Sequence, residues 1–171
     1  CPQYEVKLCY LELMEPSFKQ ALQDAPSDTY VMPLFLHQGW HFKYDITELI
    51  SLAEIQVTML PPLTFDVPLV EALYGRLMAL PPQDGVLVIY SHGSKVSETQ
   101  IHLTKLGAEL QAKSGFKCVE VLAHGSPSLA EICKQYADAG EHRITILPHF
   151  LFSGVWQQKL EQEVQRLEYD L

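Results

Sequence analysis

The chain has few positive charges, few cysteines and no long apolar run. Its 171 residues include 12 lysines and arginines against 21 aspartates and glutamates, a formal net charge of −9. Nucleic acid is bound through cationic surfaces, so this balance argues against it as a partner. The longest apolar runs, such as residues 86–90, have the length of a strand and are too short to cross a membrane. The composition therefore predicts neither a nucleic-acid-binding nor a membrane-spanning protein.

The four cysteines include no C-x-x-C pair and no zinc-ribbon spacing. Free thiols are typical of a reducing compartment and no signal peptide is visible, so we expect the protein in the cytoplasm. A P-loop and a G-x-G-x-x-G loop are also missing, and we expect no nucleotide cofactor. With 47% hydrophobic and 19% charged residues, the chain has the composition of a folded domain with a buried core.

An internal repeat organises the sequence. Residues 11–17 (Leu-Glu-Leu-Met-Glu-Pro-Ser) lead to residues 31–36 (Val-Met-Pro-Leu-Phe-Leu), and residues 124–128 (His-Gly-Ser-Pro-Ser) lead in the same way to residues 146–151 (Ile-Leu-Pro-His-Phe-Leu). In both copies a Pro-Ser pair precedes a helix-like stretch, and an apolar strand with a central proline follows. Repeats of this size are whole α/β lobes. We expect two related lobes that face each other across a cleft.

Apolar runs of strand length alternate with helical periodicity in both halves, which is typical of a parallel sheet flanked by helices. The predicted strands are residues 5–13, 29–36, 55–60, 86–90, 118–122 and 143–151, and the predicted helices are residues 17–24, 41–52, 67–79, 96–113, 128–139 and 155–167. Pro81-Pro-Gln-Asp-Gly85 is the expected junction, which places a first lobe at residues 1–82 and a second at residues 83–171.

The two halves are incomplete in different ways. The first lacks an opening strand and helix that the second has, and the second lacks a closing strand and helix that the first has. Either further residues precede Cys1 and follow Leu171, or the first sheet lacks an inner strand.

Side chains with metal-binding chemistry follow the predicted strands, where a doubly wound fold places its sites. His92 comes directly after residues 86–90, and His41 follows the strand that ends at Leu36. Glu12 lies near the end of the first predicted strand, where a carboxylate can accept a proton or steer a cation. Neutral imidazoles bind divalent transition metals. His41, His92 and Glu12 are therefore the candidate catalytic residues, and His41 and His92 are the candidate metal ligands.

Several of these residues also have a purely structural interpretation. Ser91-His-Gly-Ser94 fits a helix-capping turn in which Ser94 is the N-cap. His37 and His41 are four residues apart, as in zinc sites on helices, but Gly39 interrupts them and no H-E-x-x-H is present, which disfavours a zinc protease. The histidines that we interpret as surface or packing residues are His102, His142 and His149.

Taken together, the motifs resemble those of the sirohydrochlorin chelatases, the class II cobaltochelatases and ferrochelatases. The resemblance rests on residues 11–17, residues 31–36, the G-x-H-x-K-x-D-I string at residues 39–46 and Ser91-His-Gly-Ser94. It covers nearly the whole chain as two tandem copies. It implies a two-lobed chelatase-like fold and a lyase reaction without ATP, in which cobalt or iron is inserted into sirohydrochlorin for cobalamin or sirohaem.

The resemblance also implies roles for single residues. The family's metal-binding histidine in its G-x-H loop matches His41, and its acidic residue in the L-E-L segment matches Glu12. Its other metal histidine belongs to a His-Gly-Ser turn, which occurs here only at His92 of the second half, while Trp156 stands at the G-x-H position of that half. Either residues before Cys1 complete the first site, or His92 reaches across the lobe interface to it, or activity has decayed.

The implied partner is sirohydrochlorin or a related tetrapyrrole, whose carboxylates call for backbone amides or cations such as Lys43 or Lys95. The divalent metal is a substrate, and the proposed ligands accept cobalt, iron or nickel alike. The alternative is a non-catalytic tetrapyrrole- or metal-binding protein on the same scaffold, because a lobe that lost its histidine could still shape a pocket. Two fused lobes can form a cleft by themselves, so a monomer and a homodimer are both open.

Overall fold

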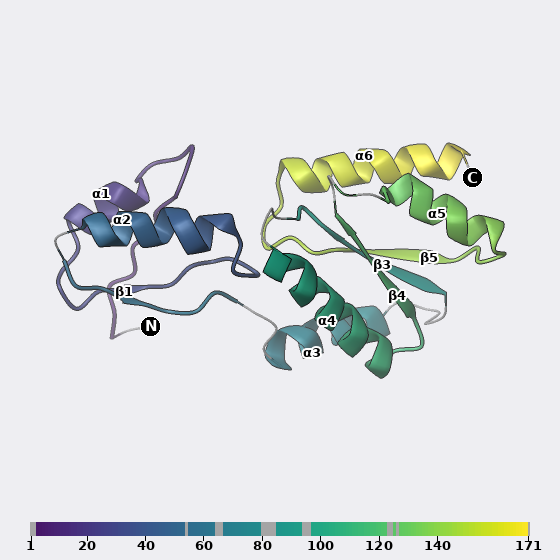
Figure 1. Cartoon of the computed structure of the whole chain (residues 1–171), viewed down its shortest axis with the longest axis horizontal. Helices are drawn as coiled ribbons and strands as arrows, with labels where there is room; N and C mark the ends of the chain where they lie inside the picture. Colours follow the sequence, from purple (N-terminus) through teal and green to yellow (C-terminus); the bar gives the residue numbers. More distant parts are fainter. Residues whose placement is uncertain are drawn as a thin grey trace.

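The computed structural model describes residues 3–53, 55–63, 67–79, 85–93, 97–122, 125 and 127–170, without the side chains of residues 67, 118–122 and 168–170. The predicted lobe boundary at residues 82 and 83 lies outside these ranges, as do Ser94, Lys95 and His124. The described residues form two parallel sheets with helices packed on them, so the predicted α/β class with two lobes is confirmed. The lobes follow each other along the longest axis of the molecule (Figure 1).

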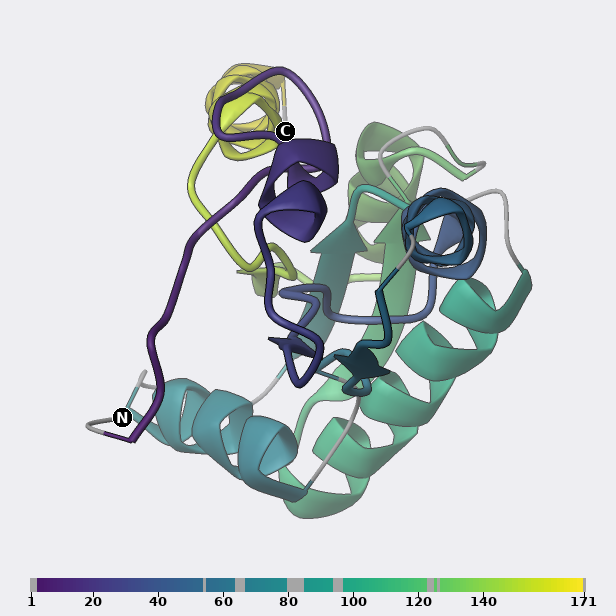
Figure 2. The ribbon, with the colours of Figure 1, turned by 90° about the vertical axis from the view of Figure 1, so that its left-hand side faces the viewer.

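Short elements form the first lobe. They are α1 (Phe18–Gln23), β1 (Tyr30–Val31), the π-helix η1 (His41–Ile46), α2 (Thr47–Leu52) and β2 (Thr58–Met59). β1 and β2 pair in parallel. Figure 2 views the molecule from this end and shows α1 and α2 on the same side of the two strands. Phe18, Leu22 and Ile46 are buried between these helices and the strands.

The Pro-Ser pair of each repeat opens a helix, as predicted. Ser17 caps α1: its hydroxyl accepts from the N–H of Gln20, whose side chain accepts from the N–H of Ser17 in return. Ser128 and Glu131 form the same reciprocal capping box at the start of α5 (Leu129–Asp138). Each box satisfies backbone donors that the first helical turn leaves free. The local chemistry of the repeat is therefore the same in both lobes.

The segment at residues 5–13, predicted as a strand, is not one. The single pairing that its described residues make is a bridge between Tyr10 and Ser17. The chain turns sharply at Leu13, where φ is 64°. This left-handed conformation ends the extended run, because neighbouring strand residues require negative φ.

The strands of the first lobe are also shorter than predicted. Of residues 29–36 only the two residues of β1 lie in the sheet, and of residues 55–60 only the two residues of β2 do. Pro33 and Pro61 have no backbone N–H, so neither can donate to a longer ladder. The first sheet consequently contains few paired residues.

The second lobe contains a three-stranded parallel sheet in the order β4-β3-β5. Its elements are β3 (Val86–Ser91), α4 (Ser97–Lys113), β4 (Lys117–Leu122), α5, β5 (Ile144–Pro148) and α6 (Val155–Asp170). Every residue of the central strand β3 is buried, as expected for a parallel strand covered on both faces. Leu87 and Ile89 pack towards α4, whereas Val86 and Val88 pack towards α5 and α6.

Helix α3 (Val67–Met78) belongs to the sequence of the first lobe but packs on the second. Its buried residues Val70 and Leu77 share a core with Leu87 and Ile89 of β3. In Figure 1, α3 and α4 therefore lie on one side of the second sheet, opposite α5 and α6. None of the described helices is both long and apolar enough to cross a membrane.

Candidate metal site

The candidate site begins with a tight turn that presents Glu12. The N–H of Met14 donates to the carbonyl of Glu12 at 2.8 Å, so Leu13 is the central residue of a γ-turn. Just before and after this turn, Tyr10 and Pro16 are held together by a hydrogen bond from the N–H of Tyr10 to the carbonyl of Pro16. This turn places the Glu12 side chain outside the core of the first lobe.

His41 is the first residue of η1. Before it, the N–H of Gly39 donates to the carbonyl of His37, and the N–H of Lys43 then donates to the carbonyl of Gly39. The chain thus bends directly into the helix that carries His41. Single π-turns of this kind occur frequently at functional sites.

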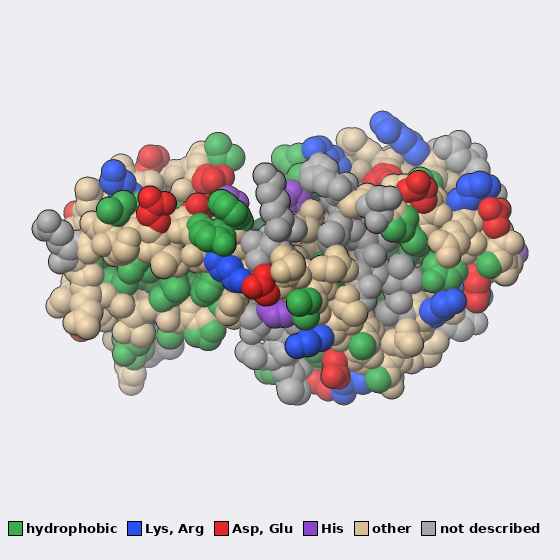
Figure 3. Space-filling model, in the orientation of Figure 1, with side chains coloured by type: hydrophobic (Ala, Val, Ile, Leu, Met, Phe, Trp, Pro, Cys, Tyr) green, Lys and Arg blue, Asp and Glu red, His purple; other side chains and the backbone are tan. Residues whose placement is uncertain are grey.

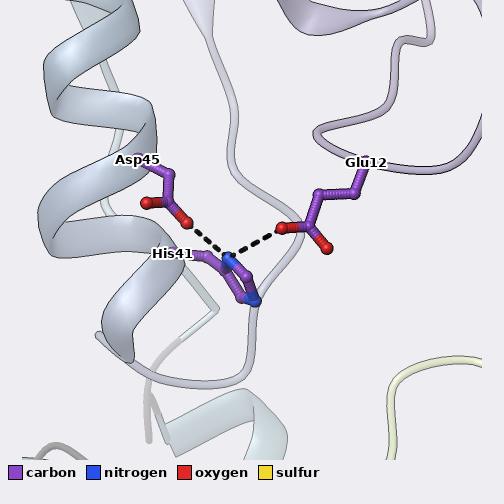
Figure 4. Close-up of side chains that lie close together, drawn as sticks. All are labelled: Glu12, His41 and Asp45. Atoms are coloured by element: carbon purple, nitrogen blue, oxygen red, sulfur yellow. Dashed lines mark hydrogen bonds and ion pairs between the residues drawn. The ribbon is translucent and has the colours of Figure 1, made fainter.

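Three ligand-type side chains meet where these two segments come together. His41 Nδ1 lies 2.6 Å from Asp45 Oδ2 and 3.9 Å from Glu12 Oε1. Figure 4 shows His41 and Asp45 on one helical segment and Glu12 reaching towards them from the facing loop. A set of ligand atoms, one from each residue, lies within 4.8 Å of one another. We refer to Glu12, His41 and Asp45 as the metal cluster.

The metal cluster is open to solvent. The side chains of Glu12, His41 and Asp45 are 62%, 50% and 34% exposed. Two carboxylates and one imidazole offer oxygen and nitrogen donors, which suit divalent first-row transition metals. Because the cluster is open, a bound ion would keep coordination positions for other ligands.

Asp45 is the member of the cluster that we did not predict. It belongs to the G-x-H-x-K-x-D-I string, but its role was not apparent there. The signal was the spacing: residues four apart on a helical segment face each other, so Asp45 can reach the imidazole of His41.

Lys43 lies between His41 and Asp45 in sequence but makes a contact of its own. Its ammonium group donates to the carboxylate of Glu98 in the first turn of α4. This hydrogen bond is the main reason why the pKa of Glu98 is lowered. Lys43, a predicted partner for substrate carboxylates, is thus engaged with a carboxylate of the second lobe.

His92 is not a member of the metal cluster. It follows β3 in the second lobe, and its ring centroid lies 4.2 Å from that of Trp156. Trp156 occupies the G-x-H position of the second half. His92 and Trp156 therefore lie in contact with their rings tilted by 52°, and the role of His92 as a metal ligand stays a prediction.

One histidine of each lobe, His37 and His149, has a lowered pKa. Burial lowers the pKa of His37, with smaller contributions from His102 and His92. Burial also lowers the pKa of His149, to about 4, and His37 contributes to this shift. His149 is a buried residue, as its interpretation as a packing residue requires. The imidazoles of His37 and His149 are therefore neutral near pH 7.

Fold and site together define a class of protein: a two-lobed α/β protein that carries an open carboxylate–histidine cluster suited to a divalent cation. The chain belongs to the CbiX family, whose model matches residues 1–80 and again residues 86–171. The double match agrees with the internal repeat.

Two curated relatives carry chelatase names. The chain is 25% identical over 178 residues to a sirohydrochlorin ferrochelatase from Priestia megaterium, covering 96% of this chain and 67% of that protein. It is also 25% identical over 178 residues to a sirohydrochlorin cobaltochelatase from the same organism, covering 94% of this chain and 58% of that protein. The chain thus spans about two thirds of the first relative and less of the second.

A solved structure shows the same fold. SirB from Bacillus subtilis with Fe3+ superposes with a TM-score of 0.78 over 95% of this chain and 70% of that chain, at 24% sequence identity. This agreement supports the arrangement of the two lobes described above.

Proposed function

We propose that this chain inserts a divalent metal, Co²⁺ or Fe²⁺, into sirohydrochlorin without ATP. The observation that carries the proposal is the metal cluster on an exposed edge of the first lobe. The names of the two curated relatives support it, one for iron and one for cobalt. Oxygen and nitrogen ligands accept both metals, so the proposal includes both.

Metal capture uses the imidazole of His41 and the carboxylate of Glu12. We assign the proton of the His41 ring to Nδ1, which donates it to Asp45 Oδ2 at 2.6 Å. This assignment leaves the lone pair of Nε2 for the metal, an arrangement in which the second carboxylate orients the ring and raises its basicity. Asp45 is then a positioning residue, and Glu12 provides an oxygen ligand.

Insertion exchanges these ligands for the four pyrrole nitrogens. Two pyrrole N–H protons must leave as the metal enters, and the exposed Glu12 carboxylate can accept them one after the other and pass each to solvent. Because the protein provides few ligands, positions remain open for the nitrogens of the macrocycle. Once four nitrogens hold the metal, the protein ligands are displaced and the product can dissociate.

We also propose that His92 contacts the metal or the macrocycle from the second lobe. Its place in the chain supports this, because His92 directly follows β3, and its charge is one of the smaller causes that lower the pKa of His37 in the first lobe. In this structure His92 lies against Trp156 and is not among the side chains that meet in the metal cluster. We therefore expect His92→Ala to reduce insertion less than His41→Ala.

The test is the absorbance change when the protein is mixed anaerobically with sirohydrochlorin and Co²⁺ or Fe²⁺, compared with a protein-free control for spontaneous insertion. We expect faster insertion with the wild-type chain and near-spontaneous insertion with His41→Ala. His142→Ala is the matched control, because His142 is an exposed histidine of the second lobe. Wild-type rates in His41→Ala would contradict the assigned site.

A second candidate function is tetrapyrrole or metal binding without catalysis. The observation that favours it is Trp156 at the G-x-H position of the second half, where its ring lies against that of His92. In the same assay, a carrier would change the absorbance of sirohydrochlorin on binding but would not accelerate metal insertion by either ion.

A further inference from the structure

Leu13 combines two unfavourable features directly beside the metal cluster. Its φ of 64° lies in a region that leucine rarely adopts, because Cβ is crowded there. Its side chain is also completely exposed to solvent. Neither feature stabilises the fold. A strained residue that is not glycine, next to a functional side chain, indicates a role in function.

Leu13 belongs to a group of exposed apolar side chains. Each of them stands within two residues of a member of the metal cluster, and each is at least half exposed. They are Leu13, Met14, Trp40 and Tyr44, which we call the apolar rim. The rings of Trp40 and Tyr44 lie in contact, with centroids 4.2 Å apart and planes tilted by 36°. Figure 3 shows hydrophobic side chains next to acidic and histidine side chains at the edge of the first lobe that faces the second.

We propose that Leu13 is a positioning residue that packs against the face of the tetrapyrrole macrocycle, with the rest of the apolar rim extending this contact. This inference rests on the proposed function. A planar macrocycle whose centre lies over the metal extends beyond it by one pyrrole ring on every side. Consecutive Cα atoms are about 3.8 Å apart, so an exposed side chain next to a metal ligand is within reach of a pyrrole ring.

Charge supports an apolar mode of binding. The chain has a formal net charge of −9, which offers little attraction to the carboxylates on the macrocycle edge. Lys43, the cation nearest to His41 in sequence, is paired with Glu98. Burial of the apolar ring face against Leu13 and Trp40 is then the main favourable contribution that this edge of the lobe can make.

The test measures two affinities in three variants of the full chain. Leu13→Ala removes most of the side chain, and Leu13→Gly also relieves the backbone strain, so a loss common to both reports the side chain itself. Leu52→Ala is the matched control, an exposed leucine at the far end of α2. The dissociation constant for sirohydrochlorin is measured by tryptophan quenching, and that for Co²⁺ alone by calorimetry.

We expect both Leu13 variants to bind sirohydrochlorin about tenfold more weakly, which corresponds to about 1.4 kcal/mol, and to bind Co²⁺ like the wild type. Leu52→Ala should bind both ligands normally. Wild-type affinity for sirohydrochlorin in the Leu13 variants, or an equal loss in Leu52→Ala, would overturn the inference and leave the proposed function intact. A parallel loss of Co²⁺ affinity would also overturn it, since Leu13 would then act only by shaping the turn at Glu12. If the wild-type chain itself did not bind sirohydrochlorin, the proposed function would fail together with this inference.

Discussion

Lys43 and Glu98 form an ion pair that joins the two lobes. Lys43 lies in η1, two residues after His41, and Glu98 lies in the first turn of α4. The contact is partly buried: the Lys43 side chain is 28% exposed and that of Glu98 is 45% exposed. The helix that carries His41 is therefore joined to the second lobe close to the metal cluster.

Glu98→Gln should slow metal insertion because it removes the ion pair between the lobes, while each lobe stays folded. We expect kcat/KM to fall about two- to fivefold, the range that one partly exposed ion pair can account for. Exchanging the charges in the double variant Lys43→Glu with Glu98→Lys should restore most of the loss. Glu71→Gln is the control, because Glu71 pairs with Lys113 between α3 and α4, away from the metal cluster. An equal loss of activity in Glu71→Gln would rule out a specific role for the lobe contact.

Asp45→Asn should weaken metal binding while leaving the ligands His41 and Glu12 in place. Asparagine has the same shape but no charge, so it orients the His41 ring less strongly and lowers its basicity. We expect the Co²⁺ dissociation constant to rise about tenfold or more, as measured by calorimetry. Asp138→Asn changes another carboxylate, one that pairs with Lys134 on α5, and should leave metal affinity unchanged. Unaltered affinity in Asp45→Asn would exclude the orienting role.

His149 should make the protein sensitive to acid. Its pKa is lowered from 6.5 to about 4, first by burial and then by His37. Between these values His149 binds a proton in the unfolded chain but not in the folded chain. The contribution of neutral His149 to the unfolding free energy is therefore fully present above about pH 6.5 and is lost as the pH falls towards 4. The shift corresponds to at most about 3 kcal/mol of unfolding free energy.

Urea unfolding of His149→Phe at several pH values tests this expectation. Phenylalanine is neutral and similar in volume, so the variant should lose less stability than the wild type between pH 6.5 and 4.5. His142→Gln removes an exposed histidine of the same lobe and should keep the wild-type pH profile. Identical profiles for His149→Phe and wild type would contradict the assignment to His149.

Gly85 should tolerate no side chain at the start of β3. Its φ is 94°, and a Cβ built on it would lie 2.4 Å from the carbonyl oxygen of Arg143. Gly140 also has a positive φ, of 84°, but a Cβ there would meet nothing within 4 Å. Both alanine variants carry backbone strain of about 1 kcal/mol, and Gly85→Ala adds a steric clash of roughly 1–3 kcal/mol. Thermal unfolding should show a clearly larger loss for Gly85→Ala, and equal losses would mean that the clash relaxes freely.

Local sequence determined where the helices and the strands of the second lobe form. It also determined where the two repeated helices, α1 and α5, begin. Pro-Ser followed by Gln20 or Glu131 specifies a capping box because the partners are three residues apart. The apolar run at residues 86–90 specifies a strand covered on both faces because consecutive side chains point to opposite faces and all of them are apolar. Such features depend on a few neighbouring residues, and the motifs around Glu12 and His41 were visible for the same reason.

Tertiary structure alone decided which distant residues meet. The approach of Glu12 to His41 depends on a turn around Leu13 that no pattern in residues 5–13 indicated. Helix α3 packs on the second sheet because its apolar residues Val70 and Leu77 complete the core there. The ion pair of Lys43 with Glu98 likewise arises between the lobes. The periodicity of a segment shows which of its faces is apolar, whereas the packing of the whole chain determines which other segment covers that face.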